Sequence, residues 1–512
     1  MLRFFASFIP FLPLRPSSNS QLLTKAVSPY LVLSITLGYF LLMFVVSYLA
    51  GRKTDNAGFF IGNRSNHWIL VTIAMIGSAM SGVTFVSVPG MVSGAGFSYL
   101  QMALGFIVGQ AVIAFVLVPL FYRIRLFSIY EYLRDRFGMT SYRTGAWLFF
   151  VSKMLGASVR IFLVTLTLQL LVFDPLGLPF ILNVLLTVFL VWLYTFFGGV
   201  KSIVWVDVLK TLSLVLSVVL SIYFIARGLG LDFRGMISSI KESEMSRMFF
   251  FDDVNDRRFF WKQFLAGAFT VIATTGLDQD MMQRNLSIKT AKDAAKNILV
   301  SSVFQFFIIA LFLTLGVMLY LYASRIGITL PAKGDQVFPF LATGGYFPLS
   351  VGILFVIGLV AAAFPAAGSA LTALTTSFTI DILGAGNKDE KDLAKTRKSV
   401  HLGMALLMGF CIFLFELLNN TTVIDAVYVL ASYTYGPLLG LFAFGIFSKR
   451  AVRDRWIPLV ALLAPLLCFI LDKNSEAWFG GYKFSYELLI LNALFTAAGL
   501  LILSKPSSPQ KA

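Results

Sequence analysis

Apolar segments of about 20 residues, the length that crosses the hydrocarbon core of a bilayer, recur along the whole chain. Shorter polar or charged segments separate them. The pattern predicts an all-α polytopic membrane protein with about thirteen transmembrane helices. We place the spans near residues 30–50, 68–95, 98–122, 145–171, 179–198, 202–226, 261–283, 297–323, 348–382, 400–418, 424–447, 456–472 and 484–504.

Composition agrees with this pattern, because 58% of the 512 residues are hydrophobic and only 13% are charged. A soluble protein could not bury so much apolar surface. The two cysteines, Cys411 and Cys468, both lie within predicted spans, so neither a disulfide framework nor a metal site is expected. The sequence also shows no phosphate-binding loop and no nucleophile–base arrangement. We therefore expect no enzyme activity and no bound cofactor.

Lysine and arginine residues gather in alternate loops of a chain whose net charge is +16. The basic loops are 123–142, 284–296, 388–398 and 449–455. The opposite loops, such as 173–179 and 419–422, carry few positive charges. The positive-inside rule then predicts an external N-terminus and a cytoplasmic C-terminus in the plasma (inner) membrane. The positive charge indicates a lipid bilayer, and not nucleic acid, as the partner.

Small and polar residues interrupt two of the predicted spans. Span 68–95 contains Gly77, Ser78, Ser81, Gly82 and Pro89, and span 261–283 contains Thr274, Thr275 and Gly276 just before an acidic pair. Each span begins a possible unit of five helices. Inverted-repeat transporters break the first helix of each repeat near the membrane midplane, where the freed backbone groups bind ligands. The alternative is that these small residues only allow neighbouring helices to approach closely.

This reading divides the chain into two repeats of five spans with flanking segments. The predicted segments are a leader (1–29), an extra helix (30–50), the first repeat (68–226), an outer loop (227–260), the second repeat (261–447), two C-terminal helices (456–504) and a cytoplasmic tail (505–512).

Arg160, Lys153, Asp207 and Lys210 are among the charged side chains inside predicted spans, where a buried charge is costly and commonly functional. Arg160 and Lys153 belong to span 145–171, and Arg160 has no acid nearby in sequence. Asp207 and Lys210 are three residues apart, so they share one helix face. The pattern fits either a functional site or a set of structural ion pairs, with Lys210 or Arg160 neutralising Asp207.

Five motifs, in order and at fitting spacings, carry a resemblance to a known family. They are FFIGNRSNHW (59–68), LYTFFGGVKSIVWVD (193–207), TGLDQDMMQR (275–284), LTTSFTIDIL (374–383) and YGPLLGLFAFGIF (435–447). Over roughly residues 30–504 the chain resembles the sodium/solute symporter family, which includes sialic-acid, monocarboxylate and iodide carriers. The resemblance implies a five-plus-five inverted-repeat (LeuT-like) core and sodium-coupled symport by alternating access.

The resemblance also implies a sodium site, and this chain lacks part of it. In the family, backbone carbonyls matching Gly77, Met80 and Ala362 and two hydroxyls matching positions 365 and 366 bind the ion. An outer site in some members adds the acid that matches Asp207. Here Pro365 and Ala366 offer no side-chain oxygen to a hard cation. Ser369, one helical turn further on, could replace them only if the helix shifts.

Lys210 stands where the family commonly has an uncharged polar residue three positions after the aspartate. An ammonium group can carry the charge of a bound cation and hydrogen-bond to the same carbonyls. A buried lysine also exchanges its proton readily. We therefore expect sodium coupling to be weakened or lost, with Lys210 as a charge substitute that makes the carrier proton-coupled.

Ser81, Thr84 and Arg160 match the positions at which the sialic-acid branch of the family binds the substrate carboxylate. A planar guanidinium in a dry cavity suits a carboxylate in two-point contact. Val83 and Thr84 stand where sugar-binding members have polar residues, which argues against a neutral hexose. The expected substrate is a small organic anion such as a sugar acid or a monocarboxylate. In the competing explanation, Arg160 pairs with Asp207 and contacts no substrate.

Further candidates rest on position and resemblance. Thr275 and Gln279 are predicted to line the cavity, and Tyr433 and Tyr435 are candidate gate residues. Asp278 and Asp280, beside Arg284, are expected to form an inner gate or a structural network. The alternative functions are an uncoupled facilitator and a membrane sensor of the substrate. The sequence carries no signal for an oligomeric state.

Overall fold

The computed structural model describes residues 27–51, 66–124, 128–196, 199–418, 423–484 and 486–505. Several sequence predictions lie outside the described residues. They are the leader before residue 27, the motif residues 59–65, the outer loop 419–422, Gly198 of the diglycine pair and the tail after residue 505.

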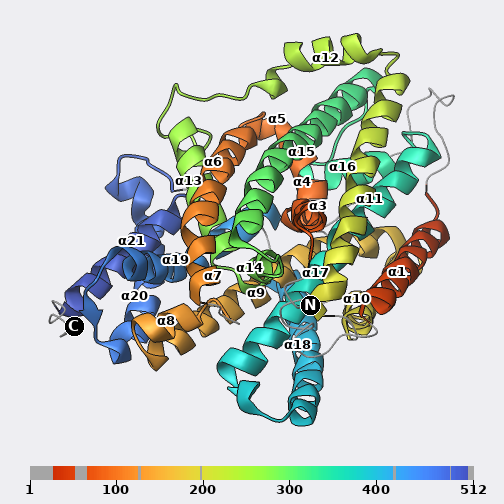
Figure 1. Ribbon diagram of the computed structural model, residues 1–512. Coiled ribbons are helices and arrows are strands. Elements are labelled where there is room, and N and C mark those ends of the chain that lie inside the picture. Colours follow the sequence, from red (N-terminus) through yellow and green to blue (C-terminus); the bar gives the residue numbers. More distant parts are fainter. Residues whose placement is uncertain are drawn as a thin grey trace, which may run out of the picture.

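The described chain is almost entirely helical (Figure 1). The helices that coincide with the expected spans are α1 (Pro29–Gly51), α3 (Trp68–Ala79), α4 (Gly82–Gly90), α6 (Tyr99–Val112), α7 (Val118–Ile124), α9 (Met139–Leu168), α10 (Phe180–Thr195), α11 (Gly199–Gly228), α13 (Phe260–Val271), α14 (Gln279–Leu286), α15 (Ala291–Ile326), α17 (Leu349–Ser377), α18 (Glu390–Leu418), α19 (Val423–Phe447), α20 (Ile457–Trp478) and α21 (Leu488–Leu503).

Shorter elements complete the fold. They are α5 (Val92–Ala95), α8 (Glu131–Arg136), α12 (Phe233–Glu242), α16 (Val337–Thr343), the π-helical turns η2 (Ile113–Leu117), η3 (Gln169–Phe173), η5 (Ile272–Gly276) and η7 (Phe378–Ile382), and the 3-10 turns η4 (Glu244–Ser246), η6 (Gly334–Gln336), η8 (Ala385–Asn387) and η9 (Asp454–Trp456). Strands β1 (Ala451–Val452) and β2 (Ser504–Lys505) form one antiparallel pair, with Ala451 opposite Lys505.

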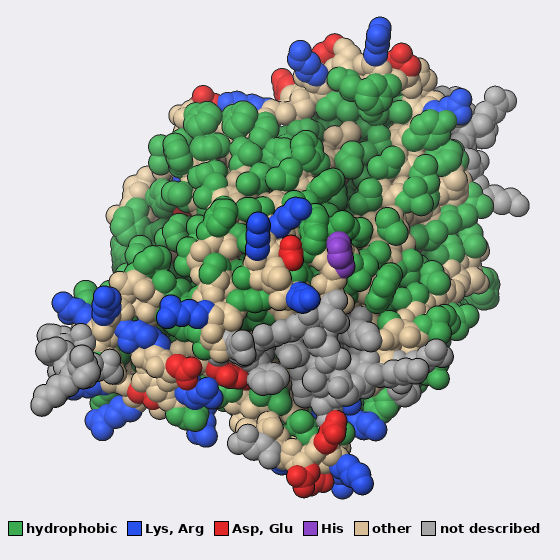
Figure 2. Space-filling model, in the orientation of Figure 1, with side chains coloured by type: hydrophobic (Ala, Val, Ile, Leu, Met, Phe, Trp, Pro, Cys, Tyr) green, Lys and Arg blue, Asp and Glu red, His purple; other side chains and the backbone are tan. Residues whose placement is uncertain are grey.

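Membrane-spanning length and hydropathy are found along the whole described chain. In that part of the chain, nine helices are long and apolar enough to cross a bilayer, or up to ten if α3 and α4 count as one bent span. Helices α10 and α21 are apolar but shorter. Hydrophobic side chains cover a broad area below the α12 end, and charged side chains lie at the α12 end, near the centre of the view and in its lower part (Figure 2). The prediction of a helical membrane protein is therefore confirmed.

The first predicted interruption is a sharp bend between α3 and α4. The two helices meet at 54°, and Met80 and Ser81 lie between them. The Met80 amide donates to the Gly77 carbonyl at 3.0 Å, and Ser81 begins α4 from an extended conformation. The backbone groups at this joint therefore leave the regular helical hydrogen-bond pattern.

The second predicted interruption separates α13 from α14. Helix α13 runs into the π-helical turn η5, and the chain then passes through Leu277 and Asp278. The Asp278 carboxylate caps α14 by accepting the Met281 amide at 3.2 Å. A carboxylate at a helix N-terminus is stabilised by the unpaired amides and by the helix dipole. Both expected breaks are thus present in the structure.

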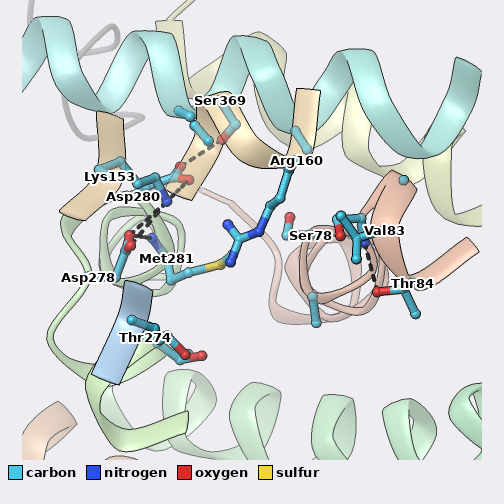
Figure 3. Close-up of a pocket in the computed structure, with 18 of the residues that line it drawn as sticks. Ser78, Val83, Thr84, Lys153, Arg160, Thr274, Asp278, Asp280, Met281 and Ser369 are labelled. Atoms are coloured by element: carbon cyan, nitrogen blue, oxygen red, sulfur yellow. Dashed lines mark hydrogen bonds and ion pairs between the residues drawn. The ribbon is translucent and has the colours of Figure 1, made fainter. Parts of the chain in front are cut away.

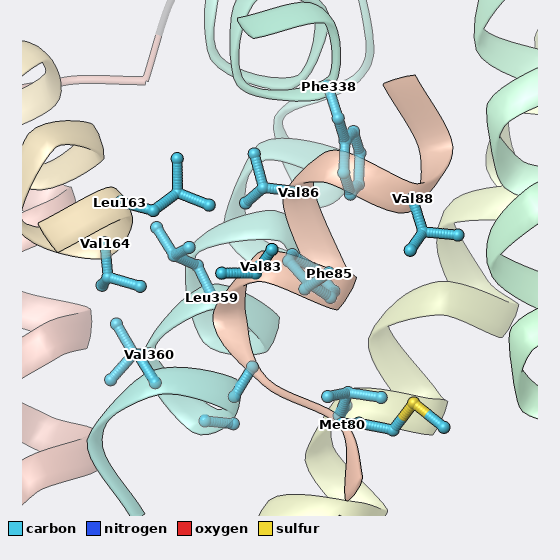
Figure 4. Close-up of a cluster of buried hydrophobic side chains, with 14 of the residues drawn as sticks. Met80, Val83, Phe85, Val86, Val88, Leu163, Val164, Phe338, Leu359 and Val360 are labelled. Atoms are coloured by element: carbon cyan, nitrogen blue, oxygen red, sulfur yellow. The ribbon is translucent and has the colours of Figure 1, made fainter. Parts of the chain in front are cut away.

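Helix α4 is held in place by an apolar cluster (Figure 4). Val83, Phe85 and Val86 project from α4 towards α9, α16 and α17. The Phe85 ring lies 5.4 Å from the Phe338 ring and 5.8 Å from the Phe355 ring, as measured between ring centroids. This dense aromatic packing fixes the short helix, whose other face is left for the cavity.

Segment 227–260 carries α12, whose side chains are all at least partly exposed. Phe233 and Ile237 are among its most exposed residues, whereas Met236 and Ile240 pack on the hydrophobic core. The helix lies across the ends of the bundle helices at one pole of the molecule (Figure 1).

Three glycines bring the backbones of α6 and α13 into direct contact. A Cβ atom added to Gly105 would overlap the Phe264 carbonyl, one added to Gly109 would overlap the Ala268 carbonyl, and one added to Gly267 would overlap the Met102 carbonyl. Small residues at such crossings are how membrane helices gain close packing. This glycine seam fixes α13, the first half of the second broken helix.

We therefore expect Gly105→Ala to destabilise the protein by about 1–3 kcal/mol, because the new methyl group would force the two backbones apart. Thermal unfolding of purified protein in detergent measures the change. Gly403→Ala is the matched control, because a Cβ at Gly403 meets no atom within 4 Å. Equal stability of the two variants would contradict the seam.

Candidate functional site

Both broken helices line one central cavity of about 150 Å³ (Figure 3). Residues of α3, α4, α13 and α14 meet there with residues of α6, α9, α11, α15, α17 and α19. The wall mixes hydroxyl groups, aromatic rings and charged side chains, so a small polar solute could be bound by several groups at once.

Ser81, Thr84 and Arg160 are brought together in this cavity, as the sequence predicts. The Ser81 amide donates to the Thr84 hydroxyl at 3.3 Å, which orients Thr84 at the start of α4. Arg160 extends from α9 into the cavity, with its guanidinium near Met281 (Figure 3). Among the described residues, no ion-pair partner is found for Arg160.

Lys153 lies two turns before Arg160 on the same face of α9, and it is buried between two acids. Its ammonium contacts both Asp278 oxygens at 3.1 and 3.0 Å and one Asp280 oxygen at 2.8 Å. The Tyr435 hydroxyl donates to Asp278 at 2.7 Å. These contacts join α9 and α19 to the first turn of α14.

Arg284 continues the pairing from α14 to α11. Its guanidinium contacts Asp280 at 2.8 Å and Asp207 at 3.0 Å, and it also donates to Ser369. The Ser369 hydroxyl donates in turn to Asp280 at 2.6 Å. All of these side chains are buried, so each charge needs its partners to remain ionised inside the protein.

Asp207 completes this sequence of contacts, because the Ser78 hydroxyl of α3 donates to its carboxylate at 2.9 Å. We call the series Lys153, Asp278, Asp280, Arg284 and Asp207 the ion-pair chain. It connects α9, α14 and α11, and through Ser78 it reaches the first broken helix.

The partner of Asp207 differs from both partners considered from the sequence, since the salt bridge is made by Arg284 and not by Lys210 or Arg160. Arg284 is 77 residues away, so sequence spacing carries no signal for the contact. The expected network around Asp278 and Asp280 is present, and it extends further than predicted.

Only some of the positions matched to the sodium site line the cavity, and the others are buried in helix packing. Ala366 and Asp207 line the cavity, whereas Ala362 and Pro365 are buried within the packing of α17. Gly77 packs against α11, where an added Cβ would overlap Thr211, and Met80 is buried. The Tyr194 hydroxyl of α10 donates to the Phe364 carbonyl at 2.7 Å, beside Pro365. Ser369 is already bound by Arg284 and Asp280.

Lys210 lies outside the cavity wall and is fully buried on α11. Within the part of the chain that the structure describes, its ammonium nitrogen has no hydrogen-bond partner. It therefore makes no hydrogen bond to the carbonyls of Gly77, Met80 or Ala362 in this conformation.

Of the remaining candidate residues, some lie at the cavity and others do not. Thr275 lines the cavity, and Tyr435 lies at its edge on Asp278. Gln279 lies outside the cavity wall, where its side-chain oxygen accepts the Ile129 amide at 2.9 Å. Tyr433 points elsewhere and donates to Asp472 of α20 at 3.0 Å.

Sequence reasoning missed several wall residues. Tyr99, Phe106 and Gln305 come from α6 and α15, and Thr270 and Thr274 come from α13 and η5. Aromatic and amide residues inside apolar spans cannot be told from ordinary packing residues in the sequence. For Thr270 and Thr274 a signal was present, because two hydroxyls four residues apart lie on one helix face. In the described residues, no group of three or more His, Cys, Asp or Glu side chains is arranged to bind a metal ion.

Two broken helices around a central polar cavity, within a bundle of apolar helices, define the core of a membrane transporter and not of an enzyme. The family profile "Sodium:solute symporter family" matches residues 59–454. The chain belongs to this family.

Individual relatives agree with the assignment. The human "Sodium/iodide cotransporter" is 26% identical over 432 residues, which cover 80% of this chain and 65% of the relative. This chain therefore spans less than two thirds of that protein. The "Sodium/sialic acid symporter NanT" of Aliivibrio fischeri is 25% identical over 444 residues, which cover 83% of this chain and 85% of the relative. The mouse "Sodium-coupled monocarboxylate transporter 1" is 27% identical over 413 residues, which cover 78% of this chain and 66% of the relative.

Solved structures confirm the predicted LeuT-like fold. A substrate-bound, outward-open Na⁺-coupled sialic acid symporter superposes with a TM-score of 0.78 at 18% identity, covering 93% of this chain and 99% of that chain. A transporter of the nucleobase-cation-symport-1 family, in a closed conformation, gives a TM-score of 0.56 at 13% identity, covering 88% of this chain and 94% of that chain.

We expect Lys153→Met to destabilise the protein by about 3–5 kcal/mol, because it would leave the buried Asp278 and Asp280 without a shared cation. Thermal unfolding in detergent measures the change. Lys395→Met, at an exposed position of α18, is the matched control. Identical unfolding of the two variants would show that the Lys153 pairs do not stabilise the fold.

Proposed function

We propose that this chain is a secondary active transporter that moves a small organic anion, such as a sugar acid or a monocarboxylate, by alternating access. The observation that carries the proposal is the Arg160 guanidinium, which extends into the central cavity with no acid bound to it among the described residues. Ser81 and Thr84 lie in the same cavity and can orient a carboxylate there.

The pairing of the charged side chains around the cavity supports an anion. The described acids that line the cavity, Asp207, Asp278 and Asp280, are all engaged by Lys153 or Arg284. Arg160, by contrast, contacts no acid among the described residues, so its guanidinium is available to bind the carboxylate of a solute. The relatives named above are named for iodide, sialic acid and monocarboxylates, which are anions at neutral pH.

The coupling ion is a separate part of the proposal. The relatives are named as sodium-coupled, but Pro365 and Ala366 leave α17 without a side-chain oxygen at the two matched positions. Ser369 and Asp207, the remaining side-chain candidates for sodium ligands, are both bound to Arg284. We infer that sodium coupling is lost or weak and that protons drive transport through Lys210.

We also propose the topology expected from the loops, with the N-terminus outside, the C-terminus in the cytoplasm, and inverted repeats at 68–226 and 261–447. The exposed basic residues Arg134, Lys289 and Lys395 all belong to loops or helix ends assigned to the cytoplasmic side, which supports this orientation.

Binding of an organic anion should raise the unfolding temperature of the purified protein without added sodium. A panel of sugar acids, monocarboxylates and neutral sugars, each with and without sodium, identifies the substrate class. Arg160→Ala should lower the affinity for the anion that stabilises the protein by about tenfold or more, because a charge-assisted contact is lost. Arg134→Ala, at an exposed arginine of α8, should leave it unchanged. Unaltered anion affinity in Arg160→Ala, with lower stability, would favour a purely structural arginine.

Uptake of the anion that binds best, into proteoliposomes at constant pH and voltage, should not require sodium, whereas an inward proton gradient should accelerate it. Lys210→Gln should lose the proton-driven component and keep exchange of labelled for unlabelled anion. Strict sodium dependence would refute the proposed coupling. Exchange without any gradient effect would indicate a facilitator, and no exchange at all would indicate a sensor.

A further inference from the structure

Of the buried polar atoms of α11 that lack hydrogen-bond partners among the described residues, two belong to ionisable side chains. They are Oδ1 of Asp207 and Nζ of Lys210. The two residues are three positions apart, so both side chains project from one face of the helix. Both are fully buried, and yet no ion pair joins them in this structure.

The surroundings of Lys210 leave few groups for it to pair with. Helices α3 and α17, which pack along α11, contain no titratable side chain. The charged groups that act on Lys210 are Asp207 of its own helix, Arg284 and Asp280 of α14, and Arg160 of α9. Tyr39 of α1, which donates to Ser213, and Tyr194 of α10 are the tyrosines near Asp207.

An ammonium group that is buried without a hydrogen-bond acceptor costs several kcal/mol. The uncharged amine avoids this cost, so the structure favours Lys210 in its neutral form while Arg284 occupies Asp207. The second carboxylate oxygen of Asp207 is the acceptor that a charged Lys210 could use.

Arg284 and Lys210 belong to parts of the fold that are expected to move differently. Arg284 is carried by α14, the inner half of the second broken helix, and Lys210 is carried by α11 together with Asp207. In transporters of this architecture, one bundle rocks against the other around the central site. A displacement of α14 from α11 would leave Asp207 buried without its cation, which is strongly unfavourable.

We propose that Asp207 exchanges its cation during the transport cycle. Arg284 holds the carboxylate in the conformation described here, and protonated Lys210 holds it after α14 withdraws. The Lys210 amine takes one proton from the aqueous side to which the cavity is then open, and it releases that proton when Arg284 returns. The proposal rests on the transporter function and assigns a positioning role to Lys210 at the step that links protons to the conformational change.

The test uses a spin-label distance and needs no substrate. Nitroxide labels are attached to Lys289→Cys, just after α14, and Lys395→Cys, on α18, in a Cys411→Ser/Cys468→Ser background. Both label positions are exposed. In proteoliposomes, acidification from pH 9 to pH 6 should shift the distance distribution towards a second population, by up to about tenfold per pH unit for one proton.

Lys210→Gln should remove this pH-dependent shift, because glutamine cannot take up the proton. Lys292→Gln, at an exposed lysine of α15, should retain it. If Lys210→Gln fails to fold, Lys210→Met serves in its place, since it removes the unpaired nitrogen at similar volume. A shift of the same size in Lys210→Gln or Lys210→Met, or no shift in the unmodified protein, would overturn the cation exchange. Either result would leave the anion-binding test untouched, so the two proposals fail separately.

Discussion

The ion-pair chain from Lys153 to Asp207 is the constraint on which the rest of the structure depends. Five buried charges cannot be left without partners in an apolar bundle, so the helices that carry them must keep one relative arrangement. The arrangement places the first turn of α14 between α9, α11 and α17. It thereby fixes the break in the second interrupted helix and one side of the cavity.

The same contacts explain the charge of the cavity. Asp280 is shared between Lys153 and Arg284, and each of these two cations also contacts a second acid, Asp278 or Asp207. All three carboxylates therefore have a cation of the protein in contact with them. This is why we propose that Arg160, two turns along α9 from Lys153, selects an anionic solute.

Much of the fold could be predicted from the sequence, because its determinants are local. The apolar lengths gave the helices, and Gly77, Ser81 and the Thr274–Gly276 segment marked the two breaks that the structure contains. Ser81, Thr84 and Arg160 could also be placed in one cavity through the family resemblance. These signals lie within single helices or within one motif.

The pairing inside the site could not be predicted in this way. Whether Asp207 faces Arg284, Arg160 or Lys210 depends on the rotation of three helices about their axes, and no spacing within one helix determines that rotation. The same holds for Gln279 and Tyr433, which the sequence suggests as cavity or gate residues. Gln279 instead accepts a hydrogen bond from the backbone just before α8, and Tyr433 donates one to α20.

Helix α17 contains Pro365, and a hydroxyl group from another helix binds the backbone beside it. Pro365 has no amide hydrogen, so it cannot donate the helical hydrogen bond to the carbonyl four residues earlier. The Tyr194 hydroxyl binds the adjacent Phe364 carbonyl, and Gly368 leaves the space that this tyrosine occupies. The region is thus stabilised by a protein hydroxyl on its α10 side.

The glycine seam between α6 and α13 has a mechanical consequence. The two backbones are in direct contact there, so no side chain can change rotamer to accommodate sliding. The two helices are therefore expected to move together as one rigid body. Any swing of α14 then concentrates its torsional change in the short joint formed by residues 272–278, where the regular helix has already ended. Residues 272–278 would then act as a hinge for α14, and the rigid pair α6–α13 would hold the other side of that hinge in place.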